Sequence, residues 1–268
     1  MHEDIRSGDH STLATILPES RDMVILVSRD SGIIAGIEVA REVYKQFDED
    51  ISLLAYKSDG DRILPNDIVF EVEGKVRSLL STERLVLNYI QRMSGIASYT
   101  NKLSQLIAGT ETKLLDTRKT TPNMRLFEKW AVLIGGGQNH RFGLFDMIML
   151  KDNHIDFAGG ISGAVASTVK YLKDHRLNLQ IEVETRNLEE VKQALETEHV
   201  DVIMLDNMDL ITMKTALDLI AGRCKTEASG RITESNIREI ALTGVDYISV
   251  GALTHSVNSL DLSLKAKN

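Results

Sequence analysis

Basic side chains stand beside short apolar segments at three places: Arg118 with Lys119, His140 with Arg141, and Lys151. A single basic pair on a loop is usually solvated and would indicate little. Here such clusters recur in a chain whose formal net charge is -8 at pH 7. If they face one cavity, they make a locally positive site in an acidic protein, which favours a ligand with several negative charges.

Carboxylates end two further apolar segments. Glu182 and Glu184 lie two positions apart in LQIEV, so a strand would direct both to one face, and Asp206 ends VDVIML. Buried carboxylates need a cation, a hydrogen-bond donor or a metal ion. Glu184 and Asp206 are therefore candidate Mg2+ ligands, directly or through water, and candidate acceptors for hydroxyl groups. The alternative is salt bridging to Lys151 or Arg141.

Small residues end the last two apolar segments, with Ser229 and Gly230 in one and Val250, Gly251 and Ala252 in the other. A single glycine after a strand is common in turns. Glycines at the ends of two consecutive strands let backbone N–H groups approach an anion closely. These residues predict a phosphate-binding cup.

The elements that carry these residues repeat between residues 109 and 253. Each repeat has a short apolar strand, a polar or glycine-bearing end and then an amphipathic helix. Helices between strands predict parallel strands with right-handed connections, and so an α/β barrel with its site at the strands' carboxyl ends. Six strands can be identified. We therefore expect an incomplete TIM-like (β/α) barrel, unless residues 159–172 hide another element.

Residues 1–108 have a different texture. Segments 22–28, 32–38, 51–58 and 67–76 are rich in Val and Ile and separated by turn residues, which predicts the strands of one open sheet in an α+β domain. The periodicity of residues 37–47 predicts a helix. A long helix is expected after an N-cap at Ser81 or Thr82, and this helix would join the two domains.

The segment between the first two barrel strands carries helix signals. Thr121 followed by Pro122 is typical of an N-cap with proline at the first helical position, and the N–H groups of such a turn would add positive potential beside Arg118 and Lys119. Residues 135–141, GGGQNHR, follow a helical pattern instead of a strand, so they are not a dinucleotide-binding fingerprint. We interpret Gly135 as a left-handed helix stop.

Composition narrows the class of protein. The acidic balance argues against a nucleic-acid binder. The start of the sequence lacks a basic region followed by an apolar one, and no 18 apolar residues run together, so we expect neither secretion nor a membrane span. The single cysteine, Cys224, cannot form an internal disulfide, which fits a reducing cytoplasm, and we expect it to be buried.

Over nearly its whole length the sequence resembles the quinolinate phosphoribosyltransferase family. The resemblance rests on ERLVLNYIQRMSGIA, LLDTRKTTP, EKWAVLIGGGQNHRFGLFDMIMLKDNHI, IEVET, VIMLDN, EASGRIT and ISVGALTHS. It implies an amino-terminal domain of residues 1–108 completed by the tail 254–268, an incomplete barrel over 109–253, and a homodimer or larger homo-oligomer.

The resemblance also implies a reaction. The phosphoribosyl group of phosphoribosyl pyrophosphate would be transferred to the nitrogen of quinolinate, with loss of pyrophosphate and CO2, to give nicotinate mononucleotide for NAD biosynthesis. Mg2+ would accompany the phosphoribosyl donor, and no organic cofactor would be needed. The resemblance implies catalytic roles for Lys119, Lys151, Glu184 and Asp206.

Roles in substrate binding follow from the same resemblance. Arg118, His140 and Arg141 would bind the pyridine carboxylates, and Arg92 would reach that pocket from a partner subunit. Ser229, Gly230 and Gly251, with their neighbours, would hold the 5-phosphate. The full set of implied binding residues is Arg92, Thr117, Arg118, Lys119, His140, Arg141, Lys151, Glu184, Asp206, Ser229, Gly230, Arg231, Val250, Gly251 and Ala252.

One residue departs from the expected pattern, because Arg231 stands where we expect glycine or another small residue. It either points to solvent or adds a cation beside the phosphate cup. Other functions also remain open. One is a related phosphoribosyltransferase of the molybdenum-transport-associated type, and another is a barrel lyase or aldolase with Lys119 or Lys151 as a Schiff base. A noncatalytic binding protein would not need Glu184 and Asp206 beside the cations.

Overall fold

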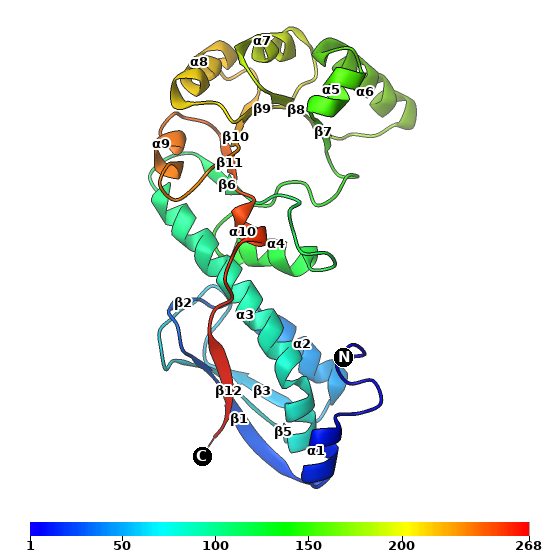
Figure 1. Cartoon of the computed structure of the whole chain (residues 1–268), viewed down its shortest axis with the longest axis vertical. Helices are drawn as coiled ribbons and strands as arrows, with labels where there is room; N and C mark the ends of the chain where they lie inside the picture. The colour runs from blue at the N-terminus through cyan, green and yellow to red at the C-terminus, as the bar shows by residue number, and fades with distance from the viewer. Residues whose placement is uncertain (268) are drawn as a thin grey trace. The chain divides into compact units, whose positions relative to one another are not determined.

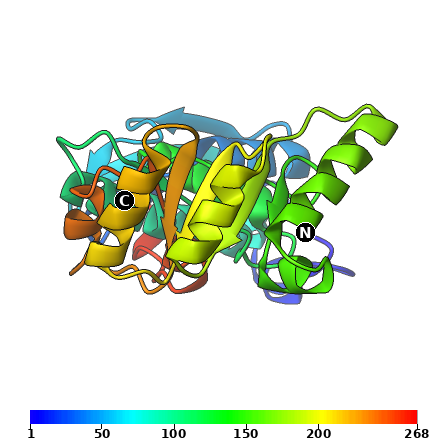
Figure 2. The same ribbon diagram turned by 90° about the horizontal axis from the view of Figure 1, so that it is seen from above.

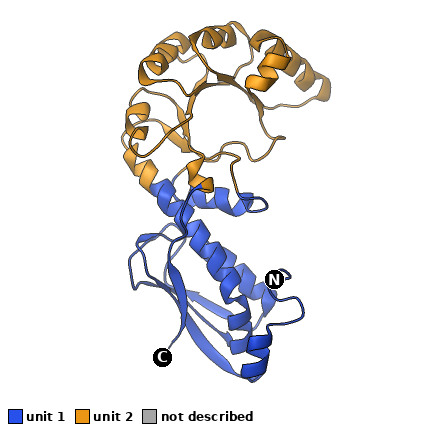
Figure 3. Ribbon diagram, in the orientation of Figure 1, with its two compact units in different colours: residues 1–101, 121–136, 256–268 blue, residues 102–120, 137–255 orange. Residues whose placement is uncertain are grey.

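The computed structural model describes residues 1–267 and divides into two compact units (Figure 3). Unit 1 comprises Met1–Asn101, Thr121–Gly136 and the chain from Ser256 onward; unit 2 comprises Lys102–Thr120 and Gly137–His255. From the sequence, residues 121–136 were expected to belong to the barrel domain. They group with unit 1 because they pack on its long helix, where a Cβ on Gly135 would stand 2.4 Å from the carbonyl oxygen of Ala97.

Unit 1 is built on a four-stranded antiparallel sheet in the order β12-β1-β5-β3 (Figure 1). Strand β12 comes from the carboxyl-terminal end of the chain and pairs with β1. The sheet's apolar face packs against the helices of the unit through a core that includes Leu26, Tyr44, Phe70 and Ile90. The strands are β1 (Arg21–Ser28), β3 (Ser52–Ala55), β5 (Ile68–Lys75) and β12 (Leu262–Ala266).

The prediction of a strand at residues 32–38 in this sheet was wrong. Only β2 (Gly32–Ile33) is extended, and it pairs with β4 (Arg62–Ile63) in a separate two-stranded sheet. Gly36 has φ of 104°, which turns the chain into helix α2 (Ile37–Phe47). The carboxylate of Asp59 caps this helix by accepting hydrogen bonds from the N–H groups of Gly36 and Ile37, both at 2.9 Å.

Two further helices of unit 1, α3 and α4, do not begin at the residues that the cap signals predicted. The long helix α3 (Val76–Leu106) continues directly from β5, so Ser81 and Thr82 are interior and Thr82 Oγ1 donates to the carbonyl of Ser78. Thr121 begins a turn instead of capping a helix, and α4 spans Arg125–Ile134. The left-handed glycine after α4 is Gly136, not Gly135. Helix α1 spans His10–Thr15.

Unit 2 contains the six predicted parallel strands in the order β6-β11-β10-β9-β8-β7. Among the described residues no strand pairing joins β6 to β7, so the incomplete barrel is confirmed. An isolated bridge from Gln138 to Leu115 continues the edge at β6. The strands are β6 (Lys113–Leu115), β7 (Ile148–Leu150), β8 (Ile181–Thr185), β9 (Val202–Asp206), β10 (Lys225–Ser229) and β11 (Tyr247–Ser249).

Helices cover the outside of the barrel strands, and α6, α7 and α8 lie side by side there (Figures 1 and 2). Residues 159–172 form a turn and most of α6, not a further strand. Cys224 is half-buried instead of fully buried. Within residues 1–267, no helix combines the length and hydropathy that a membrane span requires. The helices of unit 2 are α5 (Asp152–Phe157), α6 (Ile161–His175), α7 (Leu188–Glu196), α8 (Leu210–Ile220), α9 (Ile237–Ala241) and α10 (Ala252–His255).

Candidate active site

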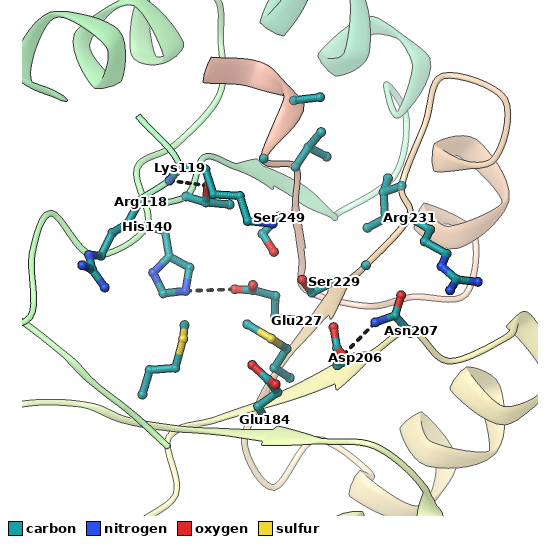
Figure 4. A pocket seen from close by; sticks show the side chains of 18 of the residues that line it. Arg118, Lys119, His140, Glu184, Asp206, Asn207, Glu227, Ser229, Arg231 and Ser249 are labelled. Atoms are coloured by element: carbon teal, nitrogen blue, oxygen red, sulfur yellow. Dashed lines mark hydrogen bonds and ion pairs between the residues drawn. The ribbon is translucent and has the colours of Figure 1, made fainter. Parts of the chain in front are cut away.

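A cavity of about 780 Å³ opens at the carboxyl ends of the barrel strands (Figure 4). Its size suits one or two small molecules. Every predicted binding residue of unit 2 lines it, while Arg92 belongs to unit 1. The predicted residues in the lining are Thr117, Arg118, Lys119, His140, Arg141, Lys151, Glu184, Asp206, Ser229, Gly230, Arg231, Val250, Gly251 and Ala252.

The lining also includes residues that the sequence analysis did not single out. Glu227 was missed although it lies two positions before Ser229 on β10, so strand alternation directs both side chains inward. Met204 likewise lies two positions before Asp206 on β9, and both side chains line the cavity. The other unpredicted lining residues are Met149, Asn207, Ile232, Ser249 and His255.

Basic residues of several segments line the cavity, and Figure 4 labels Arg118, Lys119 and His140 among them. Lys119 is held through its backbone, whose N–H donates to Thr117 Oγ1 and whose carbonyl accepts from Thr254 Oγ1. Burial lowers the pKa of Arg141, and the nearby charge of Arg118 lowers it further. An arginine nevertheless stays charged at neutral pH. Two guanidinium groups that repel each other across a cavity favour an anion between them.

Lys151 and Glu184 form an ion pair across the ends of β7 and β8, with Nζ 3.0 Å from Oε2. The salt bridge named as an alternative in the sequence analysis is thus present. On the neighbouring strand β9, Asp206 Oδ2 accepts a hydrogen bond from Asn207 Nδ2 at 2.8 Å. Glu184 and Asp206 supply carboxylate oxygens to one cavity, and oxygen is the donor that Mg2+ prefers, so the pair fits that ion.

The ends of β10 and β11 require small residues. Gly230 has φ of 94°, and a Cβ there would stand 2.4 Å from Asn207 Oδ1. At Gly251 a Cβ would stand 2.9 Å from Lys119 Cδ. Within the described chain, no hydrogen bond occupies the N–H groups of Gly230 and Gly251. Both can therefore donate to an anion at this end of the cavity.

Arg231 lies at the rim of this cup with φ of 51°, and its side chain is exposed and directed away from the centre of the cavity in Figure 4. Its carbonyl accepts a hydrogen bond from Asn236 Nδ2. The backbone of Arg231 thus shapes the loop, while its guanidinium adds positive charge at the mouth of the cavity.

His140 lies between two buried carboxylates. Its Nε2 is 3.0 Å from Oε2 of Glu182 on β8 and 3.3 Å from Oε2 of Glu227 on β10; Figure 4 shows the contact with Glu227. Burial lowers the pKa of His140, but its interactions with Glu182 and Glu227 outweigh burial and raise that pKa to about 9. Burial also raises the pKa of Glu182. The raised pKa values of His140 and Glu182 therefore favour one proton shared between these two groups at neutral pH.

The contact that Nδ1 of His140 makes indicates where the shared proton lies. The N–H of Arg141 donates to Nδ1 of His140 at 2.6 Å, so in this geometry Nδ1 carries a lone pair, the ring's own proton is on Nε2, and the proton shared with Glu182 lies on the carboxyl side of the pair. The ligand atoms of His140, Glu182 and Glu227 all lie within 4.8 Å of one another. This cluster joins a loop to two strands that are not neighbours, so no local sequence spacing predicts it.

In unit 1, Arg92 on α3 is anchored by buried groups. Its Nε and Nη2 donate to Oε1 of Glu128 at 3.0 and 2.8 Å, and Nη1 donates to the carbonyl of Val257. Glu128 is fully buried, and its Oε2 accepts from the N–H of Thr121. Arg92 is therefore a fixed and largely buried cation, not a solvated helix arginine.

Comparison with known proteins places these features in one family. Residues 96–265 match the model described as the quinolinate phosphoribosyl transferase C-terminal domain, and residues 9–94 match that of the N-terminal domain. The two matches together span most of the described chain. The boundary between them falls within α3.

Individual relatives agree with the domain matches. A chloroplastic nicotinate-nucleotide pyrophosphorylase [carboxylating] from Oryza sativa is 45% identical, over 96% of this chain and 73% of the relative. A probable nicotinate-nucleotide pyrophosphorylase [carboxylating] from Bacillus subtilis is 42% identical, over 98% and 89%. The solved nicotinate-nucleotide pyrophosphorylase from Francisella tularensis superimposes with a TM-score of 0.93 at 42% identity, covering 99% of this chain and 92% of that one.

Proposed function

This chain belongs to the quinolinate phosphoribosyltransferase family, and from that membership we infer that it converts quinolinate and phosphoribosyl pyrophosphate into nicotinate mononucleotide, pyrophosphate and CO2. The reaction supplies the pyridine nucleotide of NAD biosynthesis. The observation that carries the inference is that one cavity at the barrel's strand ends combines basic side chains, two carboxylates and a glycine cup.

The basic side of the cavity suits the pyridine substrate. Quinolinate carries two carboxylates on neighbouring ring carbons, and Arg118 and Arg141 are arginines that can each pair with a carboxylate in a planar, two-point geometry. Lys119 and Lys151 supply point charges that can serve either substrate. A neutral pyridine would leave Arg118 and Arg141 without a carboxylate partner from the substrate, which is costly in a partly buried site.

The opposite side suits the phosphoribosyl donor. The N–H groups of Gly230 and Gly251 would bind the 5-phosphate, and Glu184 and Asp206 would bind Mg2+ and the ribose hydroxyls. When bound, Mg2+ would neutralise charge on the leaving pyrophosphate. Breaking the bond from C1 of the ribose to oxygen gives that carbon oxocarbenium character, which nearby carboxylates stabilise.

Decarboxylation follows from the first step. Once the ring nitrogen carries the ribose, it is positively charged and accepts the electron pair released when the adjacent carboxylate leaves as CO2. The carbanion that forms next to the nitrogen is then protonated. The residues of this chain need only hold the ring and limit access of water, so no organic cofactor enters.

Two further proposals concern the assembly and its location. We propose that the protein acts as a homodimer or a larger homo-oligomer in which Arg92 of one copy completes the cavity of another. The fixed orientation of Arg92 supports this role, because Glu128 and Val257 hold its guanidinium in place. We also propose a cytoplasmic location, which the single half-buried cysteine fits.

Comparison of acceptors tests the proposed reaction. With phosphoribosyl pyrophosphate and Mg2+ fixed, we expect kcat/KM for quinolinate to exceed that for nicotinate by at least about 10²-fold, because nicotinate leaves one set of cations unpaired. The nicotinate mononucleotide formed from either acceptor would be separated from the substrates by chromatography and quantified. Chelation with EDTA should stop both reactions, and added Mg2+ should restore them. An equal or greater kcat/KM for nicotinate would contradict the assignment.

A further inference from the structure

Two carboxylates inside the barrel lie where burial disfavours them. Glu182 is 0% exposed and Glu227 is 1% exposed, and both approach the same nitrogen of His140. Within the described residues, neither oxygen of Glu182 has a hydrogen-bond partner of good geometry, and one oxygen of Glu227 also lacks one. Such groups cost free energy to bury, and a buried ion pair is weak evidence for a contribution to stability. Their presence therefore indicates a role other than stability.

The position of His140 suggests what that role is. Residues 139–147 contain no helix or strand, yet they carry His140 and Arg141 into the cavity. The N–H of His140 donates to Oδ1 of buried Asp116 at 2.8 Å. In addition to that hydrogen bond, the imidazole connects this irregular segment to the barrel wall, because its Nε2 contacts Glu182 on β8 and Glu227 on β10.

The imidazole also reaches forward to the next residue. Its Nδ1 accepts the N–H of Arg141, while its Nε2 faces Glu182 and Glu227. Both ring nitrogens of His140 thus have contacts within the protein. A continuous set of contacts instead runs from the two carboxylates through the imidazole to the backbone of Arg141.

We propose that Glu182 and Glu227 are positioning residues that hold the His140 imidazole and thereby orient Arg141 toward the pyridine substrate. This role rests on the proposed function, because it assigns Arg141 to quinolinate. The two carboxylates touch neither the phosphate cup nor the Lys151–Glu184 pair in any contact described above. Loss of either one should therefore affect quinolinate binding selectively.

Substitution by methionine and by glutamine tests the proposal. Methionine has nearly the length of glutamate but does not accept a strong hydrogen bond, whereas glutamine keeps an acceptor for Nε2–H. For Glu182→Met and Glu227→Met we expect KM for quinolinate to rise about tenfold or more, with KM for phosphoribosyl pyrophosphate changed by less than about twofold. Glu182→Gln and Glu227→Gln should restore most of the quinolinate affinity. Titration calorimetry with quinolinate should show the same order of affinities without turnover.

Stability and coupling separate positioning from general damage. The glutamine variants keep an acceptor for the His140 ring and should melt close to the unaltered protein, whereas each methionine variant loses one partner of a buried ion pair and should melt at a lower temperature. In a His140→Asn background, Glu182→Met should cause no additional rise in KM for quinolinate, because the connecting imidazole is already lost. Glu190→Met is the matched control, since it breaks the surface ion pair with Arg186 outside the cavity and should leave both KM values unchanged.

The results distinguish this proposal from the function on which it rests. If the unaltered enzyme does not turn over quinolinate, the proposed function fails. If it is active but the methionine variants keep its quinolinate affinity, the positioning role is wrong. Equal rises in both KM values with a large fall in melting temperature would also overturn it, because they would mark the cluster as structural.

Discussion

Replacement of Lys151 by alanine is expected to lower kcat/KM by about 10²–10³-fold or more while the fold remains intact. Lys151 follows β7, faces the cavity and contacts Glu184, so its ammonium group can pair with bound anions. Its side chain is 46% exposed, so its loss removes little packing. We expect the free energy of unfolding to change by no more than about 1 kcal/mol.

Steady-state kinetics and thermal melting of the same preparation check this prediction. Lys192→Ala is a suitable control, because Lys192 is also paired with a glutamate, Glu189, but lies outside the cavity. The control should keep its activity and its melting temperature. A fall of many degrees in the melting temperature of Lys151→Ala would show that Lys151 is structural.

The second large effect concerns Arg92, whose replacement should inactivate the enzyme through another subunit's cavity. Arg92→Gln is preferable to alanine, because the amide can still donate a hydrogen bond to Oε1 of buried Glu128, which would otherwise lose the hydrogen bonds from Arg92. Homodimers of Arg92→Gln and of Lys151→Ala should each be nearly inactive. In a mixed dimer, one cavity lacks both residues and the other has both.

Refolding of the two variants together tests this arrangement. If subunits associate randomly in equal amounts, half of the dimers are mixed and roughly a quarter of all cavities are intact. Activity should therefore return on mixing to about that fraction of the unaltered enzyme's activity. Mixtures that stay inactive, although mass spectrometry detects the mixed dimers, would show that Arg92 does not act across an interface.

The sequence predicted much of this cavity because one simple rule governs its geometry. Parallel strands bring their carboxyl ends to one face, so residues such as Lys151, Asp206 and Gly251 could be grouped although they are far apart in the chain. Alternation along a strand predicted the shared direction of Glu182 and Glu184. The same rule applied to β10 would have identified Glu227.

Other features depend on contacts that no local pattern reveals. The cluster of His140, Glu182 and Glu227 joins an irregular segment to two strands separated by β9, and no sequence spacing encodes such a contact. The helix from Thr121 was predicted too early, because Thr121 begins a turn in which its N–H donates to the buried carboxylate of Glu128, and α4 starts only at Arg125. The start of α3 was predicted too late, because the chain enters that helix directly from β5 without a cap at Ser81 or Thr82.

The grouping of α4 with unit 1 shows the same limit. Its sequence lies between two barrel strands, so the alternating pattern assigned it to the barrel. Buried Glu128 on this helix holds Arg92 of α3, and a long-range ion pair of this kind outweighs proximity in the chain. Sequence periodicity predicts which face of a helix is buried, but not which element covers it.

Release of CO2 from quinolinate labelled at the carboxyl group next to the ring nitrogen tests the central claim most directly. Our account predicts that labelled CO2 appears only when both phosphoribosyl pyrophosphate and Mg2+ are present, in an amount equal to the nicotinate mononucleotide formed. Lys151→Ala should abolish this release, and Lys192→Ala should not. Turnover of nicotinate without any release of CO2 from quinolinate would contradict the account.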